Sequence, residues 1–327
     1  MALPSEPVER RRVLTDLLRL GALSAATAGA AVWLRRRSVR PEEPPPLGLR
    51  RDVRARQIEG VPELVVAQGE DPRSTLRRAI EALGGIGRFV SPGDIVAIKP
   101  NMAWDRTPEQ AANTNPEVVA EMVRLCLQAG AARVLVGDVP TNEPHRVYQR
   151  SGIAAAAARE GAEIVLPERR RFREVDIRGE VLSAWPVFEP ILRADKIINI
   201  PIAKHHNLTG ATLGVKNWYG ILGGQRHRLH QRIHESLADL ADFVRPTLTV
   251  IDAWRVLMRN GPTGGNLADV ELRRTLIAGT DPIALDAWAA KAYWDLDERR
   301  MPYLRLAAQR GLGTPDFEKL KVAVLTG

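Results

Sequence analysis

The chain has 327 residues, of which 45% are apolar, and is long enough to bury the core of one large or two modest domains. Its formal net charge is +8, but its scattered arginines, its 5% aromatic content and the lack of a nucleic-acid-binding motif argue against a nucleic-acid partner. The single cysteine, Cys126, excludes an internal disulfide and a four-cysteine iron–sulfur cluster.

The beginning of the chain is typical of a targeting segment. Residues 10–14 read Arg-Arg-Arg-Val-Leu, which resembles the twin-arginine export signal, and an Ala/Gly-rich apolar run follows at residues 20–34. Residues 1–37 therefore predict an exported protein of the periplasm or cell envelope. The run is short for a membrane span, but arginines follow it directly, so membrane association through an uncleaved anchor is the alternative. Residues 38–60, rich in proline and charge, are predicted to be a linker.

From residue 61 onward, short apolar runs alternate with segments of helical periodicity. The predicted strands are residues 63–69, 94–99, 133–137, 162–166, 196–200, 248–251 and 275–278. The predicted helices are residues 72–83, 116–129, an alanine-rich helix that ends at Gly161, 229–243 and 282–294. This alternation is typical of a largely parallel sheet with helices on both faces. We expect residues 61–327 to form a Rossmann-like α/β domain, with a division into two subdomains left open.

A polar or charged residue follows five of the predicted strands. These residues are Asn101, Asp138, Lys204, Asp252 and Asp281. Ligands of α/β sheets bind at the carboxyl ends of the strands, so we expect the five positions to meet at one site. For Asp281 the alternative is a cap of the helix that starts with the next residue, a proline.

The segment 199–220, NIPIAKHHNLTGATLGVKNWYG, concentrates cations and hydrogen-bond donors between two apolar runs. Its small residues allow backbone amides to approach a ligand, and its two lysines suit a phosphate or a carboxylate. The segment lacks the spacing of a phosphate-binding P-loop, and tight turns without a ligand are the alternative for its glycines. The sequence predicts a small anionic ligand. The predicted ligand-binding residues are Lys99, Asn101, Asp138, Thr209, Thr212, Lys216, Asn217, Gly264 and Asp281.

Two of the six histidines are candidates for acid–base chemistry. His205 and His206 stand next to Lys204 after a predicted strand. Lys204 is expected to act as an electrostatic clamp. Asp252 is expected to orient a base or bind the ligand. These four are the predicted catalytic residues.

Three further histidines have the spacing of a metal site. His227, His230 and His234 have the i, i+3 and i+7 spacing of one helical face, and imidazoles on one helical face suit zinc, copper, nickel or iron. The interleaved Arg226, Arg228 and Arg232 argue against a bound cation. A transition-metal site and an anion pocket without metal therefore both stay open.

Several of these segments resemble domain-of-unknown-function family 362. The matching stretches are IKPN at 98–101, KHHNLTGATLGVKNWYG at 204–220, IDA at 251–253, GPTGG at 261–265 and AGTDPIALDAWA at 278–289. The resemblance covers roughly residues 60–325 and implies a fold and shared polar positions, but no settled reaction. Some relatives carry a ferredoxin-like cluster segment, for which this chain lacks the cysteines.

The sequence thus predicts an exported α/β protein that binds a small anionic or metal-associated ligand at the strand ends. A redox-linked or hydrolytic enzyme is one form of this prediction. The alternatives are a non-catalytic metal- or ligand-binding protein and an accessory partner of a membrane redox complex. The chain has no Gly-x-Ser-x-Gly nucleophile motif to decide among them.

Overall fold

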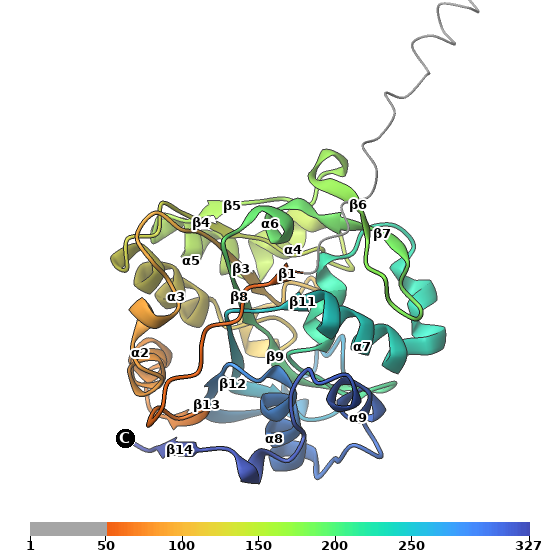
Figure 1. The fold of residues 1–327 in the computed structure, drawn as a ribbon. Coiled ribbons are helices and arrows are strands. Elements are labelled where there is room, and N and C mark those ends of the chain that lie inside the picture. Colours follow the sequence, from red (N-terminus) through yellow and green to blue (C-terminus); the bar gives the residue numbers. More distant parts are fainter. Residues whose placement is uncertain (1–50) are drawn as a thin grey trace, which may run out of the picture. The chain divides into compact units, whose positions relative to one another are not determined.

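The computed structural model describes residues 51–327 (Figure 1). The predicted signal or anchor, residues 1–37, and the first part of the predicted linker lie outside the described residues. Ten strands form the main sheet, and its central path of eight runs in the order β14–β2–β13–β12–β8–β3–β4–β5. These eight strands are β14 (Val322–Leu325), β2 (Leu64–Gln68), β13 (Val270–Gly279), β12 (Leu248–Leu257), β8 (Lys196–Ile200), β3 (Ile95–Pro100), β4 (Arg133–Val136) and β5 (Glu163–Ile164). Beside them, β9 (Ile202–His206) pairs with β12 and with β10 (Gly210–Thr212).

Most neighbours in this sheet run parallel. Strands β12, β8, β3, β4 and β5 are all parallel, and β14 is parallel to β2. The exceptions are β13, which runs antiparallel to both β2 and β12, and β10, which runs antiparallel to β9. The prediction of an α/β fold with a largely parallel sheet is confirmed. Because β13 is reversed, its carboxyl end lies at the sheet edge opposite to the ends of β8 and β3.

Helices cover both faces of the sheet (Figure 1). On one side lie α2 (Pro72–Ala82), α3 (Pro116–Gln128) and α5 (Ile153–Arg159). On the other lie α7 (Ile233–Phe243), α8 (Pro282–Trp294) and α9 (Pro302–Gln309). Two further helices, α4 (Pro144–Arg150) and α6 (Glu189–Arg193), complete the α-helices of the described residues.

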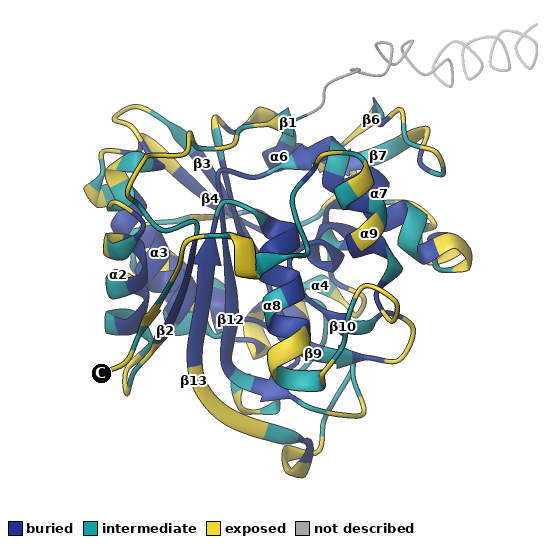
Figure 2. Cartoon of the chain, turned by 60° about the horizontal axis from the view of Figure 1, so that its bottom comes forward, coloured by how far each residue is buried: buried dark blue, intermediate teal, exposed yellow. Residues whose placement is uncertain are grey.

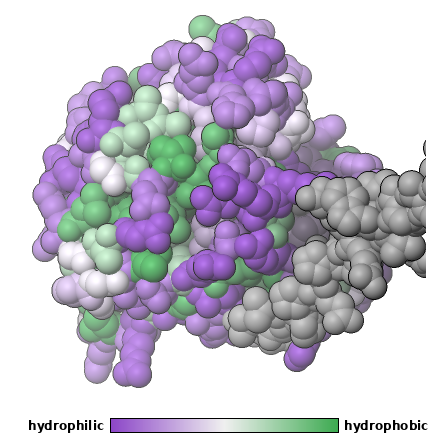
Figure 3. Space-filling model, turned by 90° about the horizontal axis from the view of Figure 1, so that it is seen from above, coloured by the Kyte–Doolittle hydropathy of each residue, from purple (hydrophilic) through white to green (hydrophobic). Residues whose placement is uncertain are grey.

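The strands alternate their side chains between two apolar clusters. In β3, Val96 and Ile98 pack on the side of α2 and α3, whereas Ala97 packs on the side of α7 and α8. This alternation is the two-residue period of a strand that is buried on both faces. Figure 2 shows the result as strands that are buried along most of their length. The outer face in Figure 3 is mostly polar, with a smaller group of apolar side chains between the polar ones.

The predicted helices begin where capping residues place them. Asn115 accepts a hydrogen bond from the amide of Glu117 and starts α3, with Pro116 at the first helical position. The predicted alanine-rich helix is α5, and α4 precedes it as a helix that the sequence analysis did not predict. They are separated at Gly152, whose φ of 73° is left-handed and interrupts the helical path.

Several elements are absent from the sequence prediction. A hairpin of β6 (Phe172–Asp176) and β7 (Ala184–Phe188) stands apart from the main sheet. Strand β1 (Arg51–Asp52) pairs with β11 (Val244–Arg245), so the end of the predicted linker packs on the domain. The first half of β13 extends beyond the core and is exposed (Figure 2). Within residues 51–327, no helix has the length and apolar character needed to cross a membrane.

Candidate functional site

A cavity of about 300 Å³ lies where β3 and β4 end and where β9 follows β8. Residues that leave these strands line it together with residues from the 3-10 helix η4 (Lys216–Ile221). Its polar and charged lining consists of Lys99, Asn101, Asp138, Thr141, Lys204, His206, Asn207, Thr212, Lys216, Asn217, Arg226 and His230. Its remaining walls include Trp104, Leu208, Tyr219, Gly220 and Pro262. The lining thus combines apolar walls with several polar and charged groups, as ligand-binding pockets do.

A buried ion pair forms the floor of the cavity. Lys99 Nζ lies 2.7 Å from Asp138 Oδ1, and both side chains are almost completely buried. Lys99 also donates to the carbonyl of Pro100 at 2.8 Å and to Asn217 Oδ1 at 2.9 Å. Burial lowers the pKa of Lys99 to about 8, although the nearby Asp138 carboxylate opposes this shift. All three ammonium protons have acceptors, so Lys99 serves as a fixed structural cation.

Gly220 leaves the space that this ion pair occupies. A Cβ at this position would lie 2.0 Å from Asp138 Oδ1 and 2.5 Å from Lys99 Nζ. The backbone of η4 therefore approaches the pair as closely as a glycine allows. The amide of Val139 in turn donates to the carbonyl of Gly220 at 2.8 Å, which joins the end of β4 to η4.

Side-chain amides connect the floor of the cavity to the second lysine. Asn217 Oδ1 accepts from Asn101 Nδ2 at 2.9 Å as well as from Lys99, and Asn217 Nδ2 donates to Asn199 Oδ1 at 2.8 Å. Asn101 Oδ1 then accepts from Lys204 Nζ at 3.0 Å. The network fixes the positions of the two lysines relative to each other, as satisfied buried polar networks do.

Lys204 is held on one side and free on the other. Besides Asn101, its Nζ donates to the carbonyl of Ala112 at 2.6 Å. Two of three ammonium protons are thus used, and the third is available to the cavity. Burial lowers the pKa of Lys204 to about 7, and the charges of Lys216 and Lys99 add to the effect while Asp138 opposes it.

Lys216 is the third buried lysine, and its environment is different. Its Nζ lies 3.9 Å from the centroid of the Tyr219 ring, a cation–π distance. Among the described residues it has no hydrogen-bond acceptor and no ion-pair partner. Burial lowers the pKa of Lys216 to about 7, with further contributions from the charges of Arg226 and Lys99. This amine can therefore contact a ligand without breaking a bond to the protein.

Arg226 adds a fixed positive charge at the rim. Its guanidinium donates to the carbonyls of Val139 and Pro140, both at 2.8 Å, and to that of Tyr219 at 2.9 Å. These contacts hold the arginine against η4 and the chain that follows β4. Burial lowers its pKa, but an arginine keeps its proton near neutral pH.

His206 is a neutral donor in this setting. Its Nδ1 accepts from the amides of Leu208 at 3.2 Å and Thr209 at 3.4 Å. Burial, followed by the charges of Lys216 and Lys204, lowers its pKa to about 2. A neutral imidazole whose Nδ1 accepts must carry its proton on Nε2. His206 can thus donate a hydrogen bond to a ligand in the cavity that it lines, but it does not act as a cation.

The cavity has a large excess of positive groups. Lys99, Lys204, Lys216 and Arg226 line it, and Asp138 is the one carboxylate among its lining residues. The mutual repulsion of these cations is part of the reason that the pKa values of Lys204 and Lys216 are low. An anion in the cavity would relieve this repulsion.

The structure places six of the predicted ligand-binding residues on this cavity and three elsewhere. Lys99, Asn101, Asp138, Thr212, Lys216 and Asn217 line it. Thr209 instead donates its hydroxyl to the carbonyl of Ala211 at 2.9 Å. Gly264 packs on Leu257, where a Cβ would approach the leucine to 3.0 Å.

Asp281 does not join the site, because β13 runs in the opposite direction to β12. It caps α8 by accepting from the amides of Ile283 at 2.9 Å and Ala284 at 3.0 Å, and it also accepts from Thr314 at 2.9 Å. Asp281 is therefore a helix cap, which was the alternative given for it. The expectation that the polar residues after all five strands meet at one site is wrong.

Two of the four predicted catalytic residues also lie outside the cavity lining. Asp252 is in the middle of β12, which continues to Leu257, and accepts from the amides of Asn115 at 2.7 Å and Trp254 at 2.9 Å. Burial raises its pKa to about 6. His205 accepts from the amide of Gly261 at 3.2 Å and so supports the glycine-rich loop. Lys204 and His206 do line the cavity.

The three histidines of the predicted metal helix are not on one helix. His227 and His230 belong to a 3-10 helix, Arg226–Arg232, and α7 begins only at Ile233. The ring of His230 contacts Tyr219 edge-on, with centroids 5.4 Å apart, whereas His234 stacks on Tyr303 at 6.3 Å. Of the three, His230 alone lines the cavity. Within residues 51–327, no group of three or more His, Cys, Asp or Glu side chains is placed to hold a metal ion.

Asp286 holds the segment that carries Lys216. Its carboxylate accepts from the amides of Gly214 at 2.6 Å and Val215 at 3.0 Å and from the hydroxyl of Tyr303 at 2.8 Å. Burial raises the pKa of Asp286 to about 7. These contacts explain how Asp286 anchors the start of η4.

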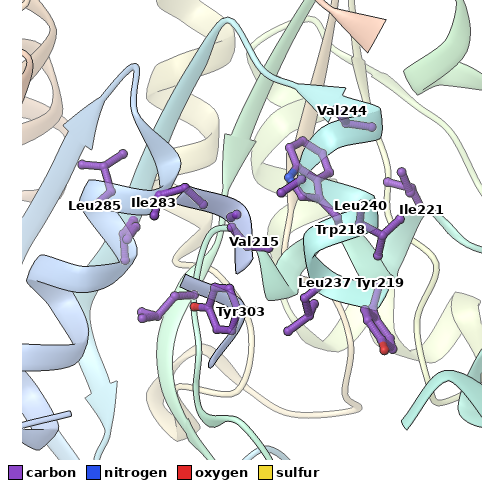
Figure 4. Close-up of a cluster of buried hydrophobic side chains, with 14 of the residues drawn as sticks. Val215, Trp218, Tyr219, Ile221, Leu237, Leu240, Val244, Ile283, Leu285 and Tyr303 are labelled. Carbon is purple, nitrogen blue, oxygen red and sulfur yellow. The ribbon is translucent and has the colours of Figure 1, made fainter. Parts of the chain in front are cut away.

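The other side of η4 is anchored by apolar packing. Figure 4 shows Trp218, Tyr219 and Ile221 of η4 beside Leu237 and Leu240 of α7. The same aromatic residue that lies under Lys216 thus also joins η4 to the core. A rigid backbone under a free amine is the arrangement that a binding site needs.

Sequence reasoning missed several lining residues. Arg226 was visible in the sequence, but it was interpreted only as an argument against a metal. Trp104, Thr141 and Pro262 come from loops whose position depends on the tertiary fold. Arg226 follows shortly after the KHHNLTGATLGVKNWYG segment, for which an anion site was predicted. This position could have indicated that the arginine binds the anion.

Comparisons with known proteins identify the family. The family model described as "Domain of unknown function (DUF362)" matches residues 96–291. The thylakoid-associated protein sll1697 of Synechocystis sp. is 30% identical over 255 residues, which cover 73% of this chain and 74% of that protein. The chain therefore belongs to the DUF362 family, as the sequence resemblance predicted.

Two solved structures have a distant likeness to the chain. A protein from Thermotoga maritima has 12% identity and a TM-score of 0.42, and the match covers 70% of this chain and 61% of that one. The lactate racemase apoprotein from Thermoanaerobacterium thermosaccharolyticum has 11% identity and a TM-score of 0.40, with 72% and 58% coverage. The chain spans less than two thirds of either structure.

Proposed function

We propose that this member of the DUF362 family binds a small anion in the cavity at the strand ends. The observation that carries the proposal is the excess of buried cations, four against one carboxylate, around a cavity of about 300 Å³. Burying several like charges is costly unless a counter-ion compensates them. A carboxylate- or phosphate-bearing ligand would supply that compensation.

The hydrogen bonds that each residue makes within the protein indicate its role in binding the anion. Lys99 and Arg226 have acceptors on the protein and supply fixed charge. Lys204, Lys216 and His206 keep donors that can bind oxygen atoms of the ligand. The volume suits a ligand of a few non-hydrogen atoms, since sites for drug-sized ligands begin at about this size.

Titration calorimetry of the full chain with oxalate, sulfate and inorganic phosphate tests the proposal. We expect at least one of these dianions to bind with one site per chain and with an affinity above that of acetate. Addition of the same dianion should raise the melting temperature of the protein. Binding of none of the three, at low ionic strength and pH 6.5, would refute the proposal.

We further propose that residues 1–37 direct the protein to the cell envelope. The Arg-Arg-Arg-Val-Leu sequence at residues 10–14 and the apolar run at residues 20–34 support this. The name of the relative sll1697 associates that protein with a membrane, which is consistent with the anchor alternative.

Replacement of Arg10, Arg11 and Arg12 by lysine should retain the chain in the cytoplasm of a host with a twin-arginine pathway. Fractionation followed by immunoblotting measures this, and carbonate extraction of the membrane fraction separates a peripheral from an anchored protein. An unchanged distribution of the variant would contradict the export proposal.

A further inference from the structure

We propose that Lys216 reacts covalently with the ligand, and that its amine forms an imine with the carbonyl carbon of a small 2-oxo acid. The carboxylate of this ligand would be held by Lys204 and the fixed charges around it. This inference rests on the proposed anion-binding function, to which it adds a ligand class and a chemical step.

The hydrogen bonds of the three lysines distinguish Lys216 from the other two. Imine formation removes two hydrogens from a neutral amine, or leaves one on the protonated imine. Lys99 would have to give up its ion pair with Asp138, and Lys204 would lose donors to Asn101 and Ala112. Lys216 has no such bond among the described residues, so it can react without leaving a buried acceptor unpaired.

The environment of Lys216 also favours the reactive form of the amine. The neutral amine, not the ammonium, is the nucleophile, and exposed lysines with a pKa near about 10.4 hold very little of it at pH 7. Burial and the charges of Arg226 and Lys99 lower the pKa of Lys216 to about 7. Roughly half of the Lys216 side chains are therefore neutral at that pH.

A donor for the carbonyl oxygen stands on the same cavity. His206 is neutral, its Nδ1 is occupied by backbone amides, and its remaining N–H is on Nε2. A neutral imidazole that donates to a carbonyl polarises it for attack without transferring a proton. His206 and Lys216 together would thus hold the carbonyl group from its oxygen and from its carbon.

The step balances without an added oxidant or reductant. The lone pair of Lys216 Nζ forms a bond to the carbonyl carbon, and the electron pair of the C=O bond moves to oxygen. That oxygen takes one proton from the attacking nitrogen and a second from the ammonium of Lys204, and it leaves as water. The product is a protonated imine, and Lys204 regains its proton from solvent.

Reductive trapping tests the inference. The full chain is incubated at pH 7 with glyoxylate, the smallest 2-oxo acid, in the presence of cyanoborohydride, and the modified lysines are located by peptide mass spectrometry. We expect Lys216 to be modified at least about tenfold faster than Lys291 and Lys319, which are exposed and paired with carboxylates on the surface. Excess oxalate, which has no electrophilic carbonyl, should protect Lys216.

A matched variant separates this inference from the function on which it rests. Lys216→Arg keeps the positive charge but forms no imine, so it should lose the trapped adduct, while oxalate binding by the wild-type chain, which needs no imine, reports the underlying function. If the wild-type chain binds oxalate but its Lys216 is modified no faster than Lys291, the covalent inference is wrong and the anion-binding proposal stands. Preferential modification of Lys204 instead of Lys216 would also contradict the covalent inference. If none of oxalate, sulfate and phosphate binds, the underlying function fails, whatever is trapped.

Discussion

Substitution of Lys204 by alanine should weaken oxalate binding at pH 7 by about 30-fold or more. The ammonium of Lys204 keeps one free proton that faces the cavity, and its two other bonds fix it in place. Removal of one partner from a buried charge pair costs about 2–5 kcal/mol. A loss of 2 kcal/mol corresponds to about 30-fold in affinity.

Two controls make this measurement specific. Lys319→Ala removes the same charge from an exposed side chain and should change the oxalate affinity less than about twofold, because surface charges are screened. Lys204→Met keeps most of the side-chain volume and should lose affinity as Lys204→Ala does. An unchanged affinity in both Lys204 variants, with the fold intact, would exclude Lys204 from the site.

Substitution of Asp286 by alanine should lower the free energy of unfolding by about 4 kcal/mol. The change leaves the amides of Gly214 and Val215 and the hydroxyl of Tyr303 without an acceptor in a fully buried position. Each unpaired buried group costs about 1–3 kcal/mol. Because these amides precede Lys216, oxalate affinity should fall as well. Urea unfolding followed by circular dichroism measures the first effect and calorimetry the second.

The isosteric variant Asp286→Asn gives a sharper test through pH. The folded-state pKa of Asp286 is raised to about 7 from its usual value near 3.8, so the folded chain binds a proton that the unfolded chain lacks between these values. This group therefore contributes stability that is present below about pH 4 and lost as pH rises to 7. The asparagine variant should lack this part of the pH dependence. Equal pH profiles in the two proteins would contradict the role given to Asp286.

The local signals in the sequence were sufficient for most elements of the sheet. Apolar runs such as DIVAIK at 94–99 coincide closely with strands, and the proline after Asp281 marked a helix start that the structure confirms. The hairpin of β6 and β7 and the short pair β1–β11 were not predicted. Strand β6 is mostly polar, β7 contains a proline, and β1 and β11 have only two residues each. The antiparallel direction of β13 was not predicted either, because strand direction depends on pairing between residues that are distant in sequence.

The dependence on contacts between distant residues also explains which site residues could be predicted. Lys204, His206, Lys216 and Asn217 are close in sequence, and Lys99 and Asp138 leave neighbouring parallel strands, so their meeting followed from general rules of α/β folds. Asp252 was misjudged because its strand continues for five residues beyond it. The three histidines at positions 227, 230 and 234 would share one helical face only if a single helix contained all of them. Helix α7 begins at Ile233 and so contains only the last.

Proton uptake on oxalate binding is the most direct test of the central claim. The unliganded pKa values of Lys204 and Lys216 are about 7, and a bound dianion favours the ammonium forms and raises both. Calorimetry at pH 8 in buffers of different ionisation enthalpy should show uptake of about one proton or more per oxalate, with affinity falling as pH rises above 7. Binding without proton uptake, and with an affinity that does not change between pH 6 and pH 9, would contradict a site built from these buried lysines.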